Sequence, residues 1–354
     1  MTPQLPDWPD YGLADDVRPA LRLARERGLP CALVTLFLVE GGGPRPPGTQ
    51  MLFAEGIVSG FLSGGCVEGD VAVHAARTLE DGEPRRLVYG EGGPWPDIRL
   101  LCGARIELLV ERVEADDPAA EALLKLMEAR VPALWRSDGR VRSCRPAAGE
   151  PLCAFDEASS TVSRRHDPVP NLVVVGSDPT ALAIAQLGAQ SGMQTLLVRP
   201  KGPPSPPPLV NVAYSRAEPE AALAAVGVDP WTAVAVATHD WETDAAALLA
   251  ALPSPAGYVG VLGARRRLAE RLARLEAAGV GRSALERLHA PIGLDIGGKA
   301  PWEVAVAVIG EIMAERQRAI ISTSTTAPAS AGAESGARRS SASASAMTVT
   351  SDES

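Results

Sequence analysis

The segment LVVVGSDPTA, residues 172–181, predicts a buried strand, a tight turn and the start of a helix. Further apolar strands are expected at 195–198, 233–237 and 258–262, and helical patterns follow at 180–190, 243–251, 264–278 and 301–319. Strands that alternate with helices indicate βαβ units, which build a parallel sheet with helices on both faces. We therefore expect a Rossmann-like, doubly wound α/β domain over residues 170–320.

The turn after this first strand departs from the dinucleotide-binding pattern G-x-G-x-x-G. Gly176 supplies the first glycine, but Asp178 stands where the second would let the backbone approach a pyrophosphate. Asp178 followed by Pro179 is a self-sufficient helix start, so a carboxylate occupies the positive end of the helix dipole. The second strand ends in Arg199, which suits a 2′-phosphate, and not in the acidic residue that holds a ribose. NAD(P) binding is therefore doubtful, and a scaffold kept for its fold or for another ligand is favoured.

Residues 1–113 predict a separate, compact α/β unit. The expected order is a helix over 13–28, strands at 31–39, 51–53 and 57–61, a helix from Gly65, and strands at 86–89 and 104–113. Residues 114–169 predict a connector with one hairpin around Asp138-Gly139. Residues 321–354 are rich in Ser, Ala and Thr, so we expect a disordered tail.

The composition indicates a globular protein, since 46% of the 354 residues are hydrophobic and 22% are charged. A net charge of -9 argues against nucleic acid and anionic membranes as partners. No run approaches the roughly 20 apolar residues of a membrane helix. The N-terminus has no signal-peptide pattern, so we expect a cytoplasmic protein. Five widely spaced cysteines without a CxxC pair disfavour zinc and a disulfide framework and predict free thiols.

The segment SGGCVE, residues 63–68, precedes and opens a predicted helix. The backbone amides of Gly64 and Gly65 are expected to be free and to face an anion. The helix dipole would stabilise the thiolate of Cys66, which makes it a candidate reactive group. Glu68 is a candidate dipole partner or proton acceptor. A lone cysteine is as often a small buried hydrophobe, so both interpretations of Cys66 stay open.

A second glycine-rich loop, GGGPRPPG at residues 41–48, holds Arg45 between rigid prolines. A guanidinium placed in this way suits a phosphate or a polar heterocycle, and the alternative is a salt bridge between loop and helix. Cys102 lies just before a predicted strand, and a structural role is favoured for it. The residues alone therefore predict anion-binding loops with a candidate thiolate.

The second domain carries further candidates. His239 directly follows a predicted strand, at the edge where α/β sheets bind ligands, so it is either an acid–base or ligand-contacting group or it bonds a neighbouring loop. Arg265 and Arg266 are expected to be solvated helix charges. Asp295, in a loop before the last helix, either caps that helix or faces the cleft between the domains, because Ala300 at the cap position cannot accept a hydrogen bond through its side chain.

Together these motifs resemble a known family. GGGPRPPGTQMLF (41–53), SGGCVEGDV (63–71) and LCGARIELLVE (101–111) are similar to the N-terminal domain of the XdhC/CoxI family, accessory factors of xanthine dehydrogenase and related molybdenum hydroxylases. THDWETD, YVGVLGARRR and HAPIGLDIGGKAPWEVAVAVIGEI are similar to the Rossmann domain that follows it in that family. The sequence departs from the family pattern at Gly43, Asp178 and Arg199, which usually are a serine, a glycine and an acidic residue.

The resemblance implies an accessory factor rather than an enzyme. Such a factor binds molybdenum cofactor as cargo, supports installation of its terminal sulfido ligand and hands it to an apo-hydroxylase. The resemblance implies that the cofactor contacts are Arg45, Gly64, Gly65, Cys66, Glu68 and Cys102, with His239 and Asp295 as the candidates of the second domain. Cys66 would then contact the molybdenum or its sulfur.

Two rival functions stay open at this point. One is an NAD(P)-dependent oxidoreductase that uses the second domain. The other is a sulfurtransferase in which Cys66 carries a persulfide supplied by a cysteine desulfurase. A homodimer is expected from the base rate for soluble proteins.

Overall fold

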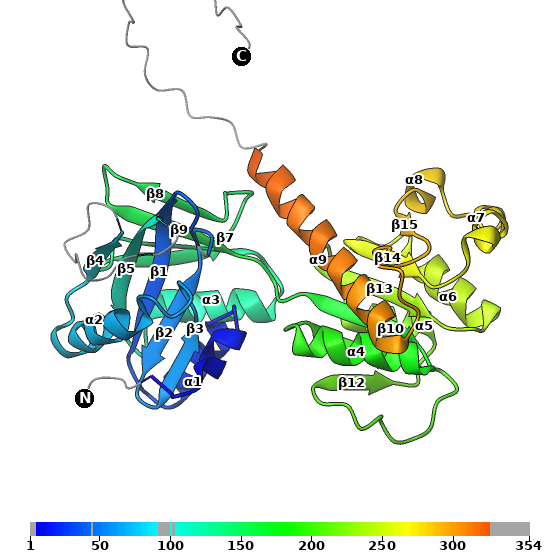
Figure 1. The fold of residues 1–354 in the computed structure, drawn as a ribbon, viewed down its shortest axis with the longest axis horizontal. Coiled ribbons are helices and arrows are strands. Elements are labelled where there is room, and N and C mark those ends of the chain that lie inside the picture. The colour runs from blue at the N-terminus through cyan, green and yellow to red at the C-terminus, as the bar shows by residue number, and fades with distance from the viewer. Residues whose placement is uncertain (1–4, 44, 91–99, 101–102, 326–354) are drawn as a thin grey trace, which may run out of the picture.

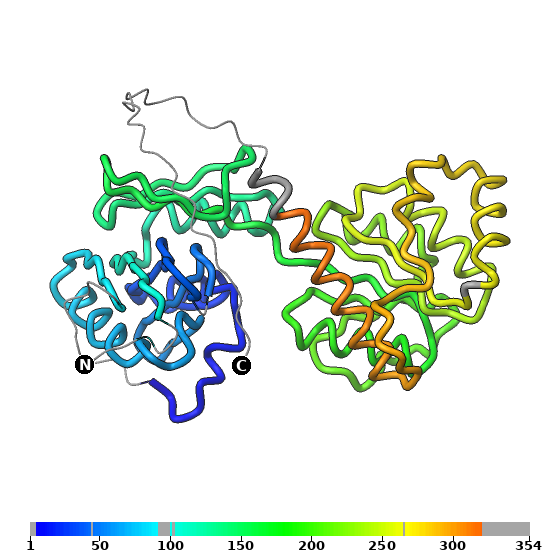
Figure 2. The backbone as a smooth tube through the Cα atoms, turned by 45° about the horizontal axis from the view of Figure 1, so that its top comes forward, coloured from blue at the N-terminus to red at the C-terminus, as the bar shows by residue number. Residues whose placement is uncertain are grey.

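The chain folds into two lobes. The computed structural model describes residues 5–43, 45–90, 100 and 103–325. Figure 1 shows the two lobes side by side, with helix α9 (Pro301–Thr325) extending from the C-terminal lobe towards the space between them. The backbone tube of Figure 2, seen from another direction, shows the same arrangement.

An antiparallel five-stranded sheet forms the centre of the N-terminal lobe. Its strands are β1 (Cys31–Glu40), β2 (Gln50–Ala54), β3 (Ile57–Gly60), β4 (Arg85–Tyr89) and β5 (Arg105–Val113). They lie in the order β3-β2-β1-β5-β4, and each neighbouring pair is antiparallel. The 3-10 helix η1 (Pro9–Leu13) and helices α1 (Arg18–Glu26) and α2 (Glu68–Asp81) accompany the sheet. The predicted elements of this unit are confirmed, but both helices begin later than expected.

Different elements cover the two faces of this sheet. Helix α2 packs on one face, where Val71 and Ala75 are fully buried. Helices α1 and α3 (Pro118–Glu128) pack on the other, with Leu21 and Leu123 in the core. Because β1 is buried on both faces, its sequence is a continuous apolar run and not an alternating one.

A second, smaller sheet follows α3. Its strands are β6 (Ala133–Ser137), β7 (Arg142–Pro146), β8 (Cys153–Asp156) and β9 (Thr161–His166), in the order β7-β6-β9-β8. Strands β6 and β7 are the expected hairpin. Strands β8 and β9 were not predicted and replace an irregular connector. Trp135 attaches this sheet to the N-terminal lobe, since its buried indole donates a hydrogen bond to Glu111 at 3.1 Å.

The C-terminal lobe is a six-stranded parallel sheet. Its strands are β10 (Asn171–Gly176), β11 (Gln194–Val198), β12 (Val212–Ser215), β13 (Thr232–Ala237), β14 (Tyr258–Val261) and β15 (Leu288–His289), in the order β12-β11-β10-β13-β14-β15. The helices are α4 (Pro179–Gln190), α5 (Pro219–Val226), α6 (Trp241–Ala251), α7 (Leu268–Ala277), α8 (Arg282–Leu285) and α9, with the 3-10 helix η2 (Arg265–Arg267) before α7. The expected Rossmann-like, doubly wound fold is confirmed.

Helices lie on both faces of this parallel sheet, as predicted. Helices α4 and α9 share one core with Leu172 and Val174, and α5, α6 and α7 share the other with Val173 and Val175. Helix α9 runs to Thr325, so residues 321–325 belong to a helix and not to the expected tail. The rest of that predicted tail, 326–354, lies outside the described residues. Within the described ranges, no helix has the length and apolar character needed to cross a bilayer.

One arginine ties the two lobes together. Nε and Nη2 of Arg130, which follows α3, donate to the carboxylate of Asp229 at 2.7 and 3.2 Å. Its Nη1 donates to the carbonyl of Val169 at 2.9 Å and to Oδ1 of Asn171 at 3.1 Å. A bidentate, charge-assisted pair has a fixed geometry. Arg130 therefore fixes the N-terminal lobe to the start of the parallel sheet at the junction of the two lobes, which we call the seam.

Candidate functional site

Two loops that carry sequence motifs lie at one edge of the N-terminal sheet. The loop at 41–49 follows β1 and the loop at 61–67 follows β3, whereas most of the third motif loop, between β4 and β5, lies outside the described residues. Because neighbouring strands are antiparallel, the ends of β1, β3 and β4 share this edge. The topology therefore brings together loops that are separate in sequence. Cys102, in the third loop, lies outside the described residues.

The carboxylate of Glu68 organises the loop before α2. This side chain is almost completely buried and sits in the first turn of the helix. It accepts hydrogen bonds from the amides of Leu62 (3.0 Å), Ser63 (2.7 Å), Gly65 (3.0 Å) and Val67 (3.3 Å) and from the Ser63 hydroxyl (2.7 Å). The Ser63 hydroxyl in turn accepts from the amides of Cys66 (3.1 Å) and Val67 (3.2 Å).

The prediction of free amides at this helix start is wrong for every residue of the loop except Gly64. Five of the six amides from Leu62 to Val67 donate within the loop. The cause is Glu68, which reaches back to the positive end of the helix as the acid of a capping box does. An external anion would have to displace a charge that the chain supplies itself. Glu68 is therefore a structural group of the loop, not a proton acceptor facing a ligand.

The same loop nevertheless exposes Cys66. Gly64 and Gly65 have φ values of 106° and 94°, which glycine adopts without steric cost. Both glycines and Cys66 are exposed to solvent. The other described cysteines are buried or half-buried, and burial raises the pKa of each thiol, to about 12 for Cys31 and to about 11 for Cys144 and Cys153. Among the four described cysteines, which are all free thiols, Cys66 is the accessible one.

Arg45 forms an ion pair with Asp15, the kind of contact that the sequence left open as the alternative. Its guanidinium is still about a third exposed, at 32%, so a ligand can reach it. The same loop is anchored to the small sheet, because the carbonyl of Gly48 accepts from Nε of Arg164 at 2.7 Å. Asp15 belongs to no recognisable motif, and sequence reasoning missed it.

A second candidate site lies at the carboxyl edge of the parallel sheet. A cavity of about 440 Å³ is bordered there by the segments that follow β10, β11 and β13. Asp178 caps α4 as predicted, accepting from the amide of Ala181 at 2.8 Å, and its other oxygen lies 3.1 Å from Nε2 of His239. Arg199 and Lys201 line the same cavity and supply positive charge.

The two candidate sites are separate. His239 is at the carboxyl edge of the parallel sheet, whereas a cavity between the lobes is lined by the starts of β10, β13 and β14 at the amino edge. Strand β13 has six residues, and at about 3.3 Å per residue the two edges lie roughly 20 Å apart. Neither Cys66 nor Arg45 lines the cavity that His239 borders, so the structure does not bring His239 next to them.

Asp295 is also remote from the motif loops. It is exposed, and it precedes the end of α9 that Figure 1 places far from the N-terminal lobe. The amides of Lys299 and Ala300 donate to Oε2 of Glu303 at 2.9 Å each, so Glu303 caps this helix. Glu303 accepts these two bonds in place of Asp295, and ligand contact by Asp295 stays a prediction.

Replacing Asp178 by alanine is expected to destabilise the C-terminal lobe by about 1 kcal/mol, because the Ala181 amide loses its cap. Urea unfolding would measure this loss. Asp178→Ser is the matched control, since serine caps equally well and should keep nearly all of the stability. An alanine variant as stable as the wild type would contradict the capping role.

Comparison with known proteins identifies the family. The XdhC and CoxI family pattern matches residues 24–90, and the XdhC Rossmann domain pattern matches residues 172–312. Over 313 residues the chain is 32% identical to an Escherichia coli K12 protein named molybdenum cofactor insertion chaperone PaoD, and the match covers 86% of this chain and 90% of the relative. This chain belongs to the XdhC/CoxI family.

Further relatives extend the likeness of this XdhC/CoxI protein. It is 25% identical over 322 residues to a Bacillus subtilis protein named as a probable xanthine dehydrogenase subunit, and the match covers 82% of this chain and 94% of the relative. A crystal structure described as a xanthine dehydrogenase from Bacillus halodurans matches with a TM-score of 0.68 at 22% identity. That match covers 85% of this chain and 96% of the other, so the fold extends over both lobes.

Proposed function

We propose that this protein is a maturation factor that binds molybdenum cofactor as cargo. It holds the cofactor while the terminal sulfido ligand is installed and inserts it into a cytoplasmic apo-hydroxylase of the xanthine dehydrogenase type. The observation that carries the proposal is the 32% identity to a relative named as a molybdenum cofactor insertion chaperone, over nearly the whole of both chains.

The edge of the N-terminal sheet offers suitable contacts for this cargo. Molybdopterin carries a phosphate and a sulfur-containing dithiolene. The exposed thiol of Cys66 and the guanidinium of Arg45 lie on two loops of the same sheet edge. Thiols suit soft metal and sulfur centres, and a guanidinium suits phosphate. Because Glu68 occupies the loop amides, the proposal assigns the phosphate to Arg45 and not to the start of α2.

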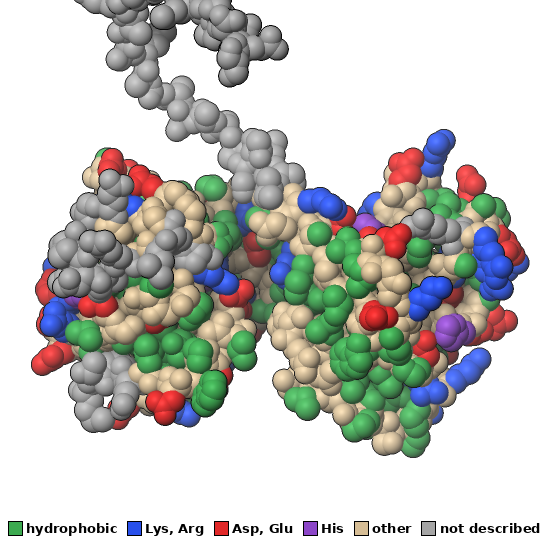
Figure 3. Space-filling view, viewed as in Figure 1, with side chains coloured by type: hydrophobic (Ala, Val, Ile, Leu, Met, Phe, Trp, Pro, Cys, Tyr) green, Lys and Arg blue, Asp and Glu red, His purple; other side chains and the backbone are tan. Residues whose placement is uncertain are grey.

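Delivery also requires contact with a recipient protein. Figure 3 shows apolar side chains gathered on the face of the C-terminal lobe that is turned to the viewer. The loop before α9 and the first turns of this helix expose Leu294, Ile296, Trp302 and Val306, each by about half. Exposed apolar clusters of this kind mark protein-contact surfaces. This feature supports a handover partner and is independent of the cofactor contacts.

Cys66→Ala is expected to lower cofactor delivery to an apo-hydroxylase without unfolding the protein. Mutating a residue that only supports the metal ligands typically lowers metal affinity by roughly 10–100-fold. Cys66 is proposed to contact the cargo directly, so we expect at least about a tenfold loss of cofactor delivery. Molybdopterin that co-purifies with the protein, and the hydroxylase activity recovered on mixing, would measure the effect. Melting temperatures would report folding.

Cys144→Ala is the matched control. Cys144 is half-buried in β7, and burial raises its pKa, so it should not contact cargo. Full cofactor delivery by Cys66→Ala would show that the thiol does not contact the cargo. Absence of stoichiometric molybdopterin in wild-type protein, from cells that make the cofactor, would overturn the proposed function itself.

A further inference from the structure

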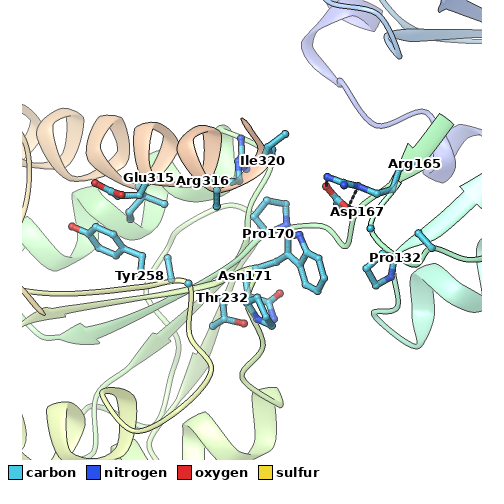
Figure 4. Close-up of a pocket in the computed structure, with 18 residues that line it drawn as sticks. Pro132, Arg165, Asp167, Pro170, Asn171, Thr232, Tyr258, Glu315, Arg316 and Ile320 are labelled. Atoms are coloured by element: carbon cyan, nitrogen blue, oxygen red, sulfur yellow. Dashed lines mark hydrogen bonds and ion pairs between the residues drawn. The ribbon is translucent and has the colours of Figure 1, made fainter. Parts of the chain in front are cut away.

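An open cavity of about 290 Å³ lies in the seam between the lobes. Figure 4 shows its walls: Arg165 and Asp167 on the side of the small sheet, and Tyr258, Glu315 and Arg316 on the side of the parallel sheet and α9. Most of the remaining lining is apolar and includes Trp231, Pro170, Ile312 and Ala319. The volume lies near the lower end of the range of roughly 300–1,000 Å³ for small-molecule sites.

The walls of this cavity are fixed by the fold. Asn171 and Thr232 begin β10 and β13, two central strands of the parallel sheet. Arg130 holds the adjoining segments together through Asp229, Asn171 and the carbonyl of Val169. A cavity bounded by paired strands and a bidentate ion pair is largely pre-formed, as ligand sites usually are.

Most of the polar side chains of the lining have a partner within the protein. Arg165 pairs with Asp167 at 2.9 Å, and the Tyr258 hydroxyl donates to Glu311 at 2.5 Å. The Asn171 amide accepts from Arg130, the Thr232 hydroxyl donates to Asp229, and Glu315 pairs with Arg318. Among the charged side chains of the described lining, Arg316 is the one with neither a hydrogen bond nor an ion pair.

The negative charge near Arg316 is weak and shared. Its guanidinium is half-buried, and burial lowers its pKa below the ordinary value. Asp15 opposes this shift but is itself paired with Arg45. The carboxylate of Asp15 is therefore shared between two arginines, Arg45 on the loop after β1 and Arg316 on α9. A partly buried cation without its own partner is costly, and a bound anion would relieve that cost.

We propose that the seam cavity binds a compact organic anion with a planar or otherwise apolar body. The apolar walls take the body of the ligand, and Arg316 holds its carboxylate or phosphate. This site is distinct from the carboxyl-edge cavity of the parallel sheet and does not depend on the proposed cofactor function. Because the ligand would touch the small sheet, the parallel sheet and α9 together, binding also couples the two lobes.

The test uses the full chain and calorimetric titration with 2-naphthoate, a planar monoanion, against the neutral 2-naphthamide. Naphthoate should bind, and the amide should bind clearly more weakly. Arg316→Met keeps the alkyl stem but removes the charge, so we expect a roughly tenfold to hundredfold weaker affinity for naphthoate. Arg282→Met is the matched control, because Arg282 is exposed on α8 and neither it nor its partner Glu286 lines the cavity.

A second variant tests the place of binding. Ala319 lines the cavity from an exposed helical position, so Ala319→Phe should fill the cavity and abolish binding without unfolding α9. Equal affinity of wild type and either variant, or equal binding of naphthoate and naphthamide, would overturn the proposal. Titration with 6-carboxypterin tests whether the ligand of this cavity is a pterin or another organic acid. Arg316-dependent binding of both anions supports a pterin-type occupant, and binding of naphthoate alone supports the site with a different organic acid.

Discussion

Replacing Arg142 by methionine is expected to destabilise the N-terminal lobe by about 3–5 kcal/mol, the usual result of breaking a buried ion pair from one side. The carboxylate of Glu111 is almost completely buried and accepts from Nε of Arg142 at 2.9 Å. The indole of Trp135 and the Ser137 hydroxyl donate to the same carboxylate. Arg142 also contacts Asp117, the N-cap of α3, at 2.8 Å. Its removal leaves a buried carboxylate without a counter-charge.

The loss should depend on pH in a definite direction. Burial raises the pKa of Glu111 above its ordinary value, and Arg142 opposes that shift. Without the arginine the pKa of native Glu111 rises further above that of the unfolded chain. A carboxyl group of this kind costs stability increasingly as the pH rises from the pKa of the unfolded chain to that of the native state, and the cost is absent below both. The stability deficit of Arg142→Met should therefore be largest near about pH 8 and shrink towards about pH 5.

Arg140→Met is the matched control for this experiment. Arg140 lies in the same hairpin but is largely exposed, and its ion pair with Glu83 is a surface pair. Such pairs contribute roughly 0–1 kcal/mol, so this variant should melt close to the wild type. Thermal unfolding of the wild type, Arg142→Met and Arg140→Met between about pH 5 and pH 8 would measure the difference in stability. Identical melting temperatures for Arg142→Met and Arg140→Met would contradict the role of the buried pair.

The sequence predicts the fold of the parallel sheet well, because its central strands are long apolar runs between helical segments. The strands it does not predict are short or polar. Strand β15 has two residues, and β8 and β9 contain CAFD and TVSRRH, which lack a continuous apolar face. These strands exist because β9 pairs with β6, β8 pairs with β9 and β15 pairs with β14, which is tertiary information.

The candidate site is predicted only in part. The exposed loop at Cys66 and the cap at Asp178 follow from local spacing, and both are present. The free amides are wrong because Glu68, the first residue of α2, folds its carboxylate back onto the loop, and the segment lacks the Ser/Thr-x-x-Glu spacing of a capping box that would have indicated this. Asp15 and Arg316 carry no such signal, since residues so far apart in the chain are brought near only by the packing of the lobes.

Replacing Glu68 by glutamine is expected to cost about 2–3 kcal/mol and to abolish most cofactor delivery. One glutamine oxygen can still accept from the amides of Leu62 and Ser63. The new amide group, however, would face the amide of Gly65, which then has no acceptor, and the amide of Val67, which keeps only its bond to the Ser63 hydroxyl. Buried donors left without partners cost roughly 1–3 kcal/mol each, although relaxation of the exposed glycines reduces the total.

Cys66→Ser separates the thiol from the shape of its loop. Serine leaves the Glu68 hydrogen bonds intact, so this variant should keep the stability of the wild type and lose delivery. Glu68→Gln should lose both, and its Cys66 should react with iodoacetamide at a changed rate, because the thiol is no longer held in one place. Melting temperatures, alkylation rates and co-purified molybdopterin would be measured together. A Glu68→Gln variant with unchanged stability and alkylation rate would show that the loop keeps its shape without this carboxylate.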